Sequence, residues 1–315
     1  MGALVSVLIC TLNHADYLQA TLQSLSQVNI PSGIEAEVVV VDNGSQDRTA
    51  EVVHSFANSA VNIQYVVEPR RGQSYARNTA MAQARGDIFL WTDDDVTLPP
   101  SWISDMVTPL LSGEYQGAGG RVKMNPSLER PWMTGSHFVR LSDTRCWPDD
   151  LAVMIGANMA FTRDVLKKIP AFDVELGPGQ LGFRDDTLFY SQMLAAGLKI
   201  ATVPHSVVEH NFEPSRLTSK YWIKNAVSSG NSGAYMSHHW QHDSANRPAM
   251  REMLWKGMLA AFRATQKRRA PDEEGCHRFE LKAVENVTFY QALRKIASEP
   301  RHYDRLGLVK KNSNT

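Results

Sequence analysis

Apolar and polar residues alternate along the first 125 residues in a pattern that predicts strands and helices in turn. Four short apolar runs are typical of buried parallel strands, at residues 5–10, 37–41, 63–67 and 88–91. Between them, apolar residues recur at helical spacing. We expect these helices to begin at Asp16, with Gln19 as its capping partner, after Ser45, and at Gln73. This order predicts an α/β fold with a doubly wound, mainly parallel sheet.

The remainder of the chain divides into two parts. Residues 123–153 are rich in loops, after which regular structure resumes over 154–161, with a helix at 188–196 and a strand at 199–203. From residue 214 onward the apolar spacing is helical. We therefore predict a catalytic domain over 1–213, with a donor half at about 1–122 and an acceptor half at about 123–213. The region 214–315 should be a helical extension, with a disordered tail from Lys310.

Composition narrows the class of protein. The chain has 315 residues, 43% of them hydrophobic, and its acidic and basic residues balance, so no global charge favours nucleic acid as a partner. The three cysteines, Cys10, Cys146 and Cys276, predict neither a disulfide framework nor a zinc site and favour a reducing compartment. We expect a cytoplasmic protein. Residues 253–269 are apolar and end in three basic residues, so a peripheral contact with the inner face of the membrane stays open.

Three consecutive carboxylates, Asp93, Asp94 and Asp95, follow the strand at 88–91. Carboxylates at this spacing repel one another unless a cation lies among them. Their oxygens suit magnesium or manganese, which commonly share a site with substrate phosphates. Ligands in open α/β sheets bind beyond the carboxyl ends of the strands, where this cluster is expected. The alternative is a solvated acidic turn before a helix.

Taken together, the motifs resemble the family-two inverting glycosyltransferases, which have the GT-A fold. The resemblance covers about residues 4–233, through the segments 5–13, 38–45, 72–86, 93–95, 156–158, 172–173 and 185–186 and through His210. It implies metal-assisted transfer of a sugar from a nucleotide-diphosphate donor, a UDP-, dTDP- or GDP-sugar, to an acceptor hydroxyl with inversion. The implied pathways assemble polysaccharide, glycolipid or glycoprotein glycans.

The resemblance assigns a donor site to the ends of the first strands. Asp42 is expected to accept hydrogen bonds from the base, and Thr11 and Asn13 to contact the nucleoside. Arg77, near a helix start, would hold the diphosphate. In the acidic motif Asp93 approaches the ribose and Asp94 is the variable middle position.

The resemblance also assigns the metal and the base. Asp95 and His210 are the expected ligands of manganese or magnesium. Asp186 is the expected general base, with Asp185 beside it. Most members of the family have Glu-Asp at this pair, so Asp185 departs from the pattern. Both carboxylates have an alternative role as charges at a helix N-terminus.

The acceptor, a glycan or a lipid-linked sugar, is expected to contact Asn158, Trp132 and Trp147, because aromatic faces stack on sugar rings or cover apolar lipid. The alternative is that both tryptophans anchor a long loop. Two other functions stay open. A sugar-phosphate nucleotidyltransferase also places carboxylates on a nucleotide-binding sheet, but its glycine-rich signature is missing from residues 10–13. The other is an inactive module that binds sugar nucleotides.

Overall fold

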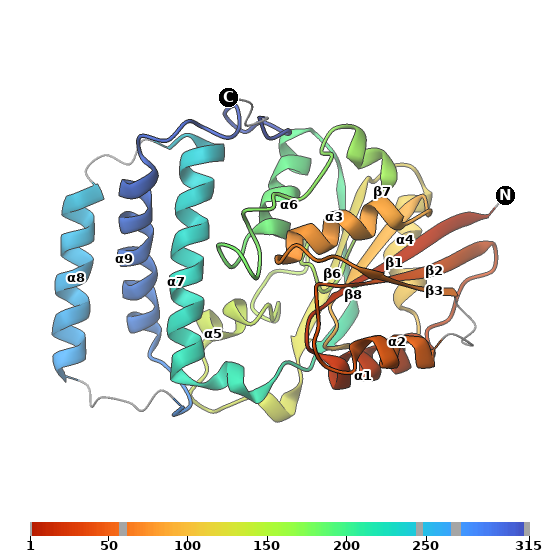
Figure 1. The fold of residues 1–315 in the computed structure, drawn as a ribbon, viewed down its shortest axis with the longest axis horizontal. Coiled ribbons are helices and arrows are strands. Elements are labelled where there is room, and N and C mark those ends of the chain that lie inside the picture. Colours follow the sequence, from red (N-terminus) through yellow and green to blue (C-terminus); the bar gives the residue numbers. More distant parts are fainter. Residues whose placement is uncertain (1, 57–61, 244–247, 266–271, 312–315) are drawn as a thin grey trace.

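A computed structural model describes residues 2–56, 62–243, 248–265 and 272–311. A strand-rich part and a row of three long helices lie side by side (Figure 1). The basic residues Lys267, Arg268 and Arg269 considered above lie outside the described residues.

The strands form one mixed sheet in the order β3-β2-β1-β4-β7-β6-β8-β5. They span β1 (Ala3–Thr11), β2 (Ile34–Asp42), β3 (Asn62–Val67), β4 (Ile88–Thr92), β5 (Val96–Thr97), β6 (Gly117–Met124), β7 (Met159–Thr162) and β8 (Ile200–His210). The four strands expected from the apolar runs, β1 to β4, pair in parallel. β7 instead runs antiparallel to both β4 and β6, so the second half of the sheet is less regular than the first.

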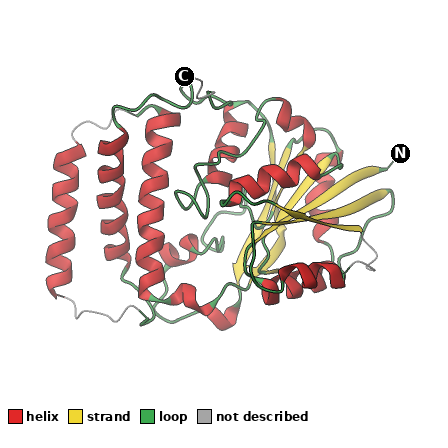
Figure 2. Ribbon diagram, in the orientation of Figure 1, coloured by secondary structure: helices red, strands yellow, loops and turns green. Residues whose placement is uncertain are grey.

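Helices cover both faces of the sheet (Figure 2). They span α1 (Ala15–Leu25), α2 (Thr49–Ser55), α3 (Gln73–Gln83), α4 (Trp102–Leu111), α5 (Gly135–Arg140), α6 (Asp185–Ala195), α7 (Ser219–Tyr235), α8 (Pro248–Thr265) and α9 (Arg278–Ile296). Alternate residues of β1 point to opposite faces. Val7 packs in the core under α1, α2 and α4, and Leu8 packs in the core under α3 and α6.

Several elements begin or end at other residues than the sequence predicts, and side-chain hydrogen bonds explain the helix starts. The second helix begins at Thr49 rather than just after Ser45, because the Asp47 carboxylate accepts hydrogen bonds from both the backbone N–H and the hydroxyl of Thr49. Ser45 instead accepts a hydrogen bond from the backbone N–H of Asn13. The first helix begins at Ala15 rather than Asp16, and the backbone N–H of Ala15 donates to the Asp47 carboxylate (3.0 Å). The loop-rich stretch contains α5, and the last strand continues to His210 rather than ending near residue 203.

The C-terminal helices lie in the order α7, α9, α8 from the sheet outward (Figure 1). The helical character expected after residue 214 is therefore confirmed, while its division from the catalytic part as a separate domain stays a prediction. No helix in the described part of the chain is both long and apolar enough to cross a membrane.

A buried carboxylate ties the end of the chain to the sheet domain. Asp173 accepts hydrogen bonds from the hydroxyls of Tyr235 (2.6 Å) and Tyr303 (2.7 Å), and Lys310 Nζ lies 2.7 Å from its other oxygen. The expected disorder from Lys310 is therefore wrong at Lys310 itself. Burial opposes ionisation of Asp173, but the charge of Lys310 and these hydrogen bonds hold its pKa below the usual value.

Asp173→Ala should lower the free energy of unfolding by about 3–5 kcal/mol, since it leaves a cation and two hydroxyls without their partner. Because the folded pKa of Asp173 is depressed, its stabilisation is present above the unfolded value of about 3.9 and is lost as the pH falls toward the folded value. Urea titrations at pH 7 and at about pH 3 measure both effects. Asp164→Ala, at an exposed ion pair with Lys167, is the matched control and should cost under about 1 kcal/mol. Equal effects of the two variants would contradict this role.

Candidate active site

A cleft of about 990 Å³ opens at the carboxyl ends of the central strands. One wall comes from the ends of β1, β4 and β8, and the opposite wall from α5, α7 and α9. The structure brings nine of the expected residues into its lining: Thr11, Arg77, Asp93, Asp94, Asp95, Trp147, Asp185, Asp186 and His210. These residues come from segments up to 200 positions apart, and the sheet order brings them together.

Asp93, Asp95 and His210 form the acidic end of the cleft, and their ligand atoms all lie within 4.8 Å of one another. His210 reaches Asp95 because β5 pairs with β8, and its Nε2 lies 3.2 Å from Asp95 Oδ1. Arg216 Nη2 lies 3.3 Å from the other Asp95 oxygen, which is buried and makes no hydrogen bond. Two carboxylates and one imidazole, with a buried oxygen left unsatisfied, fit a divalent cation such as manganese.

The charges at this end are tightly coupled. Burial raises the pKa of Asp93 to about 6, and the neighbouring Asp95 carboxylate adds to the rise. Burial also opposes ionisation of Asp95, but the positive charges of His210 and Arg216 hold its pKa well below the usual range. Burial disfavours the charged form of His210, yet Asp95 raises its pKa. The site therefore holds one anionic carboxylate between two cations, beside a second carboxylate whose ionisation burial and the neighbouring charge oppose.

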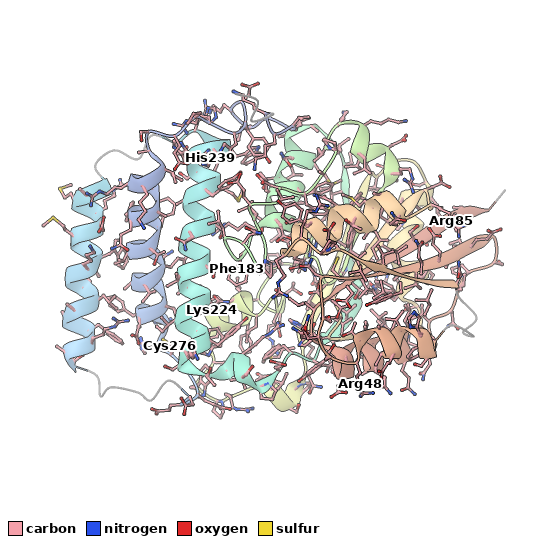
Figure 3. The ribbon with its side chains drawn as sticks, viewed as in Figure 1. Arg48, Arg85, Phe183, Lys224, His239 and Cys276 are labelled. Atoms are coloured by element: carbon pink, nitrogen blue, oxygen red, sulfur yellow. The ribbon has the colours of Figure 1, made fainter. Side chains whose placement is uncertain are left out.

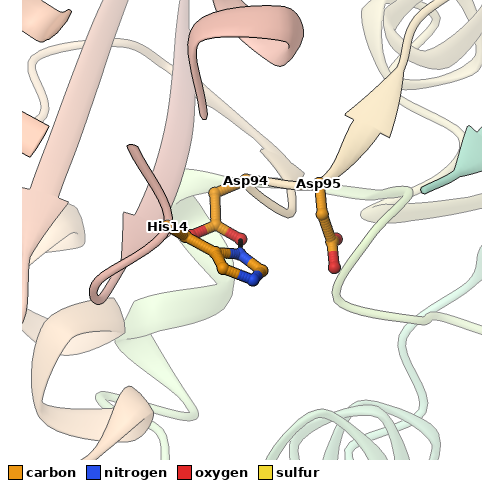
Figure 4. Close-up of side chains that lie close together, drawn as sticks. All are labelled: His14, Asp94 and Asp95. Atoms are coloured by element: carbon orange, nitrogen blue, oxygen red, sulfur yellow. Dashed lines mark hydrogen bonds and ion pairs between the residues drawn. The ribbon is translucent and has the colours of Figure 1, made fainter. Parts of the chain in front are cut away.

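His14 was not anticipated from the sequence, and it forms a second cluster with Asp94 and Asp95 (Figure 4). Its Nδ1 lies 3.0 Å from Asp94 Oδ1. Asp95 belongs to both clusters, so the structure offers two candidate sets of metal ligands that share one carboxylate. No local motif marked His14, and its role depends on the loop after β1 meeting the loop after β4.

Arg77 and Asp185 form a buried ion pair at the centre of the cleft, with Nη1 3.2 Å from Oδ2. The guanidinium also lies over the rings of Trp91 and Phe172. A side chain at Gly156 would place its Cβ 2.0 Å from Arg77 Nη2, so only glycine fits there. Arg77 therefore fixes Asp185, besides facing the cleft in which a diphosphate is expected.

Asp186 differs from Asp185 in having no ion-pair partner among the residues that the structure describes. Its Oδ2 accepts a hydrogen bond from the backbone N–H of Gly156 (3.1 Å), and its Oδ1 accepts one from the backbone N–H of Thr187. These bonds orient the carboxylate without pairing it to a cation. Both carboxylates line the cleft, and Asp185 is the one whose charge is paired with an arginine.

Of the donor-binding residues expected at the ends of the first strands, only some line the cleft. Thr11 lines the cleft, and its buried hydroxyl makes no hydrogen bond. Asp42 accepts hydrogen bonds from the backbone N–H of Ser45 and from the hydroxyl of Tyr65, while Asn13 accepts one from the backbone N–H of Gln46. Neither Asp42 nor Asn13 belongs to the cleft lining, so their contact with a nucleoside stays a prediction.

Asn158 does not have the expected place at the acceptor. Its side chain is fully buried, accepts a hydrogen bond from Trp102 Nε1, and donates to the carbonyls of Arg121 and Ser206. These bonds hold β6, β8 and α4 together. The expectation of an acceptor contact fails because the residue points into the sheet rather than the cleft.

The two tryptophans expected at the acceptor lie in different environments. Trp147 lines the cleft, whereas Trp132 lies outside the lining and packs edge-on against His137 and Trp222, with ring centroids 5.3 and 6.1 Å away. Trp132 therefore anchors the loop to the helical region, which is the alternative role, and contact with an acceptor stays a prediction for Trp147.

Trp132→Ala should lower the free energy of unfolding by roughly 2–4 kcal/mol, because it empties part of a packed aromatic cluster. Trp147→Ala should leave the melting temperature within about 2 °C, since its ring faces the cleft. Thermal unfolding measured by circular dichroism compares the two directly. A larger loss of stability in Trp147→Ala than in Trp132→Ala would reverse these roles.

The chain is similar in sequence to a known protein family and to several characterised relatives. The model of the family described as Glycosyl transferase family 2 matches residues 6–170. Glycosyltransferase AglE of Haloferax volcanii is 33% identical over 120 residues, which cover 38% of this chain and 39% of AglE. Succinoglycan biosynthesis protein ExoM of Rhizobium meliloti is 27% identical over 224 residues, about 70% of each chain. The match to AglE thus spans well under two thirds of that protein.

Solved structures support the fold. The mannosyltransferase PcManGT from Pyrobaculum calidifontis, solved with GDP-Man and Mn²⁺, superposes with a TM-score of 0.53 at 20% identity, over 95% of this chain and 76% of its own. A structure of Staphylococcus aureus TarS, residues 1–349, gives a TM-score of 0.50 at 17% identity, over 97% and 93%. The expected GT-A fold is confirmed. With the family model matching more than half of its length, the chain belongs to glycosyl transferase family 2.

Proposed function

We propose that this chain is a metal-dependent, inverting glycosyltransferase that uses a nucleotide-diphosphate sugar. The observation that carries the proposal is the pairing, in one cleft, of a divalent-cation site with a separate carboxylate. Asp93, Asp95 and His210 make the first, and Asp186 is the second. The donor is a UDP-, dTDP- or GDP-sugar, bound over the part we propose as the donor half, 1–122.

Each group has a defined task in this reaction. A bound manganese or magnesium ion, held by Asp95 and His210, would neutralise charge on the diphosphate. Asp186 takes the proton from the acceptor hydroxyl as its oxygen attacks the anomeric carbon, and the bond from that carbon to the diphosphate oxygen breaks. Arg77 holds Asp185 in place and supplies positive charge near the departing diphosphate. A single displacement of this kind inverts the anomeric centre.

We propose that the acceptor is a glycan or a lipid-linked sugar bound over the acceptor half, 123–213, against Trp147. The name of ExoM, a succinoglycan biosynthesis protein, supports a place in polysaccharide assembly. The wall formed by α5, α7 and α9 closes the acceptor side of the cleft.

A panel of nucleotide sugars tests this function. Thermal unfolding is followed with each sugar nucleotide in manganese and again in excess chelator, and consumption of the donor is followed in parallel. We expect one nucleotide class to raise the melting temperature only with metal and to be consumed. Stabilisation without consumption would favour an inactive binding module. Turnover of a sugar 1-phosphate with a nucleoside triphosphate would favour a nucleotidyltransferase.

We further propose that α8 contacts an anionic membrane surface. Its outer face exposes Met250 (59%), Met253 (73%), Leu254 (61%) and Met258 (37%). Arg251 is exposed beside this face, whereas Lys256 and Arg263 form ion pairs with the buried Glu252 and with Glu280 of α9. Basic residues beside an apolar face are typical of helices that lie in the interface of anionic lipid.

The double variant Met253→Asp with Leu254→Asp should reduce the fraction bound to phosphatidylglycerol vesicles by roughly tenfold, because it removes two apolar side chains from the contact. Flotation on a density gradient measures the bound fraction, with phosphatidylcholine vesicles and Lys224→Asp as controls. Equal binding by the variant would contradict the proposal. A monomer produced by the variant from a dimeric protein would identify a second copy as the partner instead.

A further inference from the structure

A second cavity of about 330 Å³ adjoins the cleft beyond the proposed base. It lies between the start of α6 and the helices α7 and α9, and it shares four lining residues with the cleft: Arg184, Ser229, Lys282 and Glu285. In Figure 3, Phe183 marks the loop that enters α6 opposite α7. An acceptor that reaches Asp186 from the helical side passes these residues.

Arg184, the residue directly before Asp185 and Asp186, has an unusual backbone and an unsatisfied side chain. Its φ is 73°, the left-handed region that an arginine rarely occupies. Its Nε is buried without a hydrogen-bond partner, and within the described part of the chain its guanidinium makes no hydrogen bond and no ion pair. Burial lowers the pKa of Arg184 below its usual value. A guanidinium held in this state lacks an acceptor for its donors.

The neighbouring carboxylate does not supply that acceptor. Glu285 forms an ion pair with Arg140 and accepts a hydrogen bond from Ser229 (3.1 Å). Lys282 is exposed on α9, lines both cavities, and likewise has no ion pair among the described residues. Neither Arg184 nor Lys282 forms an ion pair among the described residues, although Glu285 and Asp186 lie near Arg184 and Asp243 also lines the second cavity.

We infer that Arg184 and Lys282 form a subsite for an anionic group of the acceptor, a phosphate or a sugar carboxylate. The planar guanidinium presents paired N–H donors suited to either oxyanion, and Lys282 adds positive charge at the mouth. Because Arg184 is two residues from Asp186, binding of the anion would place a hydroxyl of the same acceptor near the base. This subsite rests on the proposed function, since it specifies the acceptor of that cleft.

The Arg184 Nε–H resonance gives a test that does not require turnover. In ¹⁵N-labelled full-length protein with excess chelator, this signal is identified by its loss in Arg184→Lys. Inorganic phosphate, glucuronate and the neutral methyl glucoside are then titrated separately. We expect phosphate, glucuronate or both to shift the signal saturably, and methyl glucoside to leave it unchanged. Lys282→Gln should weaken binding of the anion by about two- to fivefold. The matched control is Lys224→Gln, which replaces an exposed lysine on α7 (Figure 3) and should leave binding of the anion unchanged.

The outcomes separate the subsite from the proposed function. A response to phosphate alone assigns a phosphorylated acceptor, and a response to glucuronate alone assigns an acidic sugar. No response to either anion, or equal responses to all three compounds, overturns the subsite. Arg184→Lys should melt at the same or a higher temperature, because the guanidinium it removes has no partner. A clear fall would show that Arg184 is structural. Loss of metal-dependent donor binding in the nucleotide panel would refute the proposed function while leaving this titration unaffected.

Discussion

Asp95→Asn is expected to abolish metal-dependent donor binding and to lower donor turnover by at least about 10³-fold. The substitution keeps the shape of the side chain and removes the anion on which both candidate ligand clusters depend. It also leaves His210 and Arg216 without the carboxylate that pairs with them, 3.2 and 3.3 Å away. Calorimetric titration of the stabilising nucleotide, in manganese and in chelator, measures the binding. Full binding or turnover by the variant in manganese would refute the metal site.

Two histidine variants then decide which ligands complete the site. His210→Gln removes an imidazole from the cluster with Asp93, and His14→Gln removes one from the cluster with Asp94. We expect His210→Gln to weaken manganese-dependent donor binding by about 10- to 100-fold and His14→Gln to weaken it much less. His14 lies 3.0 Å from Asp94 and 3.7 Å from Glu213, and His210 lies 3.2 Å from Asp95, so each variant removes an imidazole from a carboxylate partner. The reverse order would assign the metal to His14.

The donor half of the sheet follows closely from the apolar runs of the sequence. β1, β2, β3 and β4 lie where the apolar segments predict them. The pattern is clearest for β4, which is buried at every position, whereas β3 is a partly exposed edge strand. The boundaries of the helices are less predictable. The start of α2 depends on Asp47, whose two hydrogen bonds to Thr49 outweigh the capping tendency of Ser45.

The site shows a similar division. Residues at the ends of single strands, such as Asp95 and His210, come together because the sheet order places them there. Where the direction of a side chain depends on tertiary packing, the sequence does not predict whether it faces the cleft. Asn158 points into the sheet and Trp132 into the helical cluster, and no local signal distinguishes them from Trp147. Arg184, likewise, has an ordinary local sequence, and only the packed helices α7 and α9 reveal that its donors are unsatisfied.

Asp185 and Asp186 are adjacent in sequence, and the structure gives them different electrostatic surroundings. Burial raises the pKa of Asp185, although the charge of Arg77 opposes the rise. The Asp185 carboxylate also lies against Gly177, where a Cβ would come within 3.0 Å of its carboxyl carbon. Because Asp185 is buried and paired with Arg77, we expect it to position Arg77 and the adjacent loop.

Asp186→Asn should reduce transfer by roughly 10²–10⁴-fold, the range expected when a general base is lost, with donor affinity changed by less than about twofold. The amide keeps the size of the carboxylate, and its one oxygen can still accept a hydrogen bond from the backbone N–H of either Gly156 or Thr187, but it cannot take up the acceptor proton. Asp185→Asn should instead lower the melting temperature and weaken donor binding together, because it removes the charge that pairs with buried Arg77. Rates of donor consumption, calorimetric donor binding and thermal unfolding, measured on both variants, separate these effects. If Asp185→Asn loses turnover with its stability intact while Asp186→Asn remains active, the two carboxylates exchange roles.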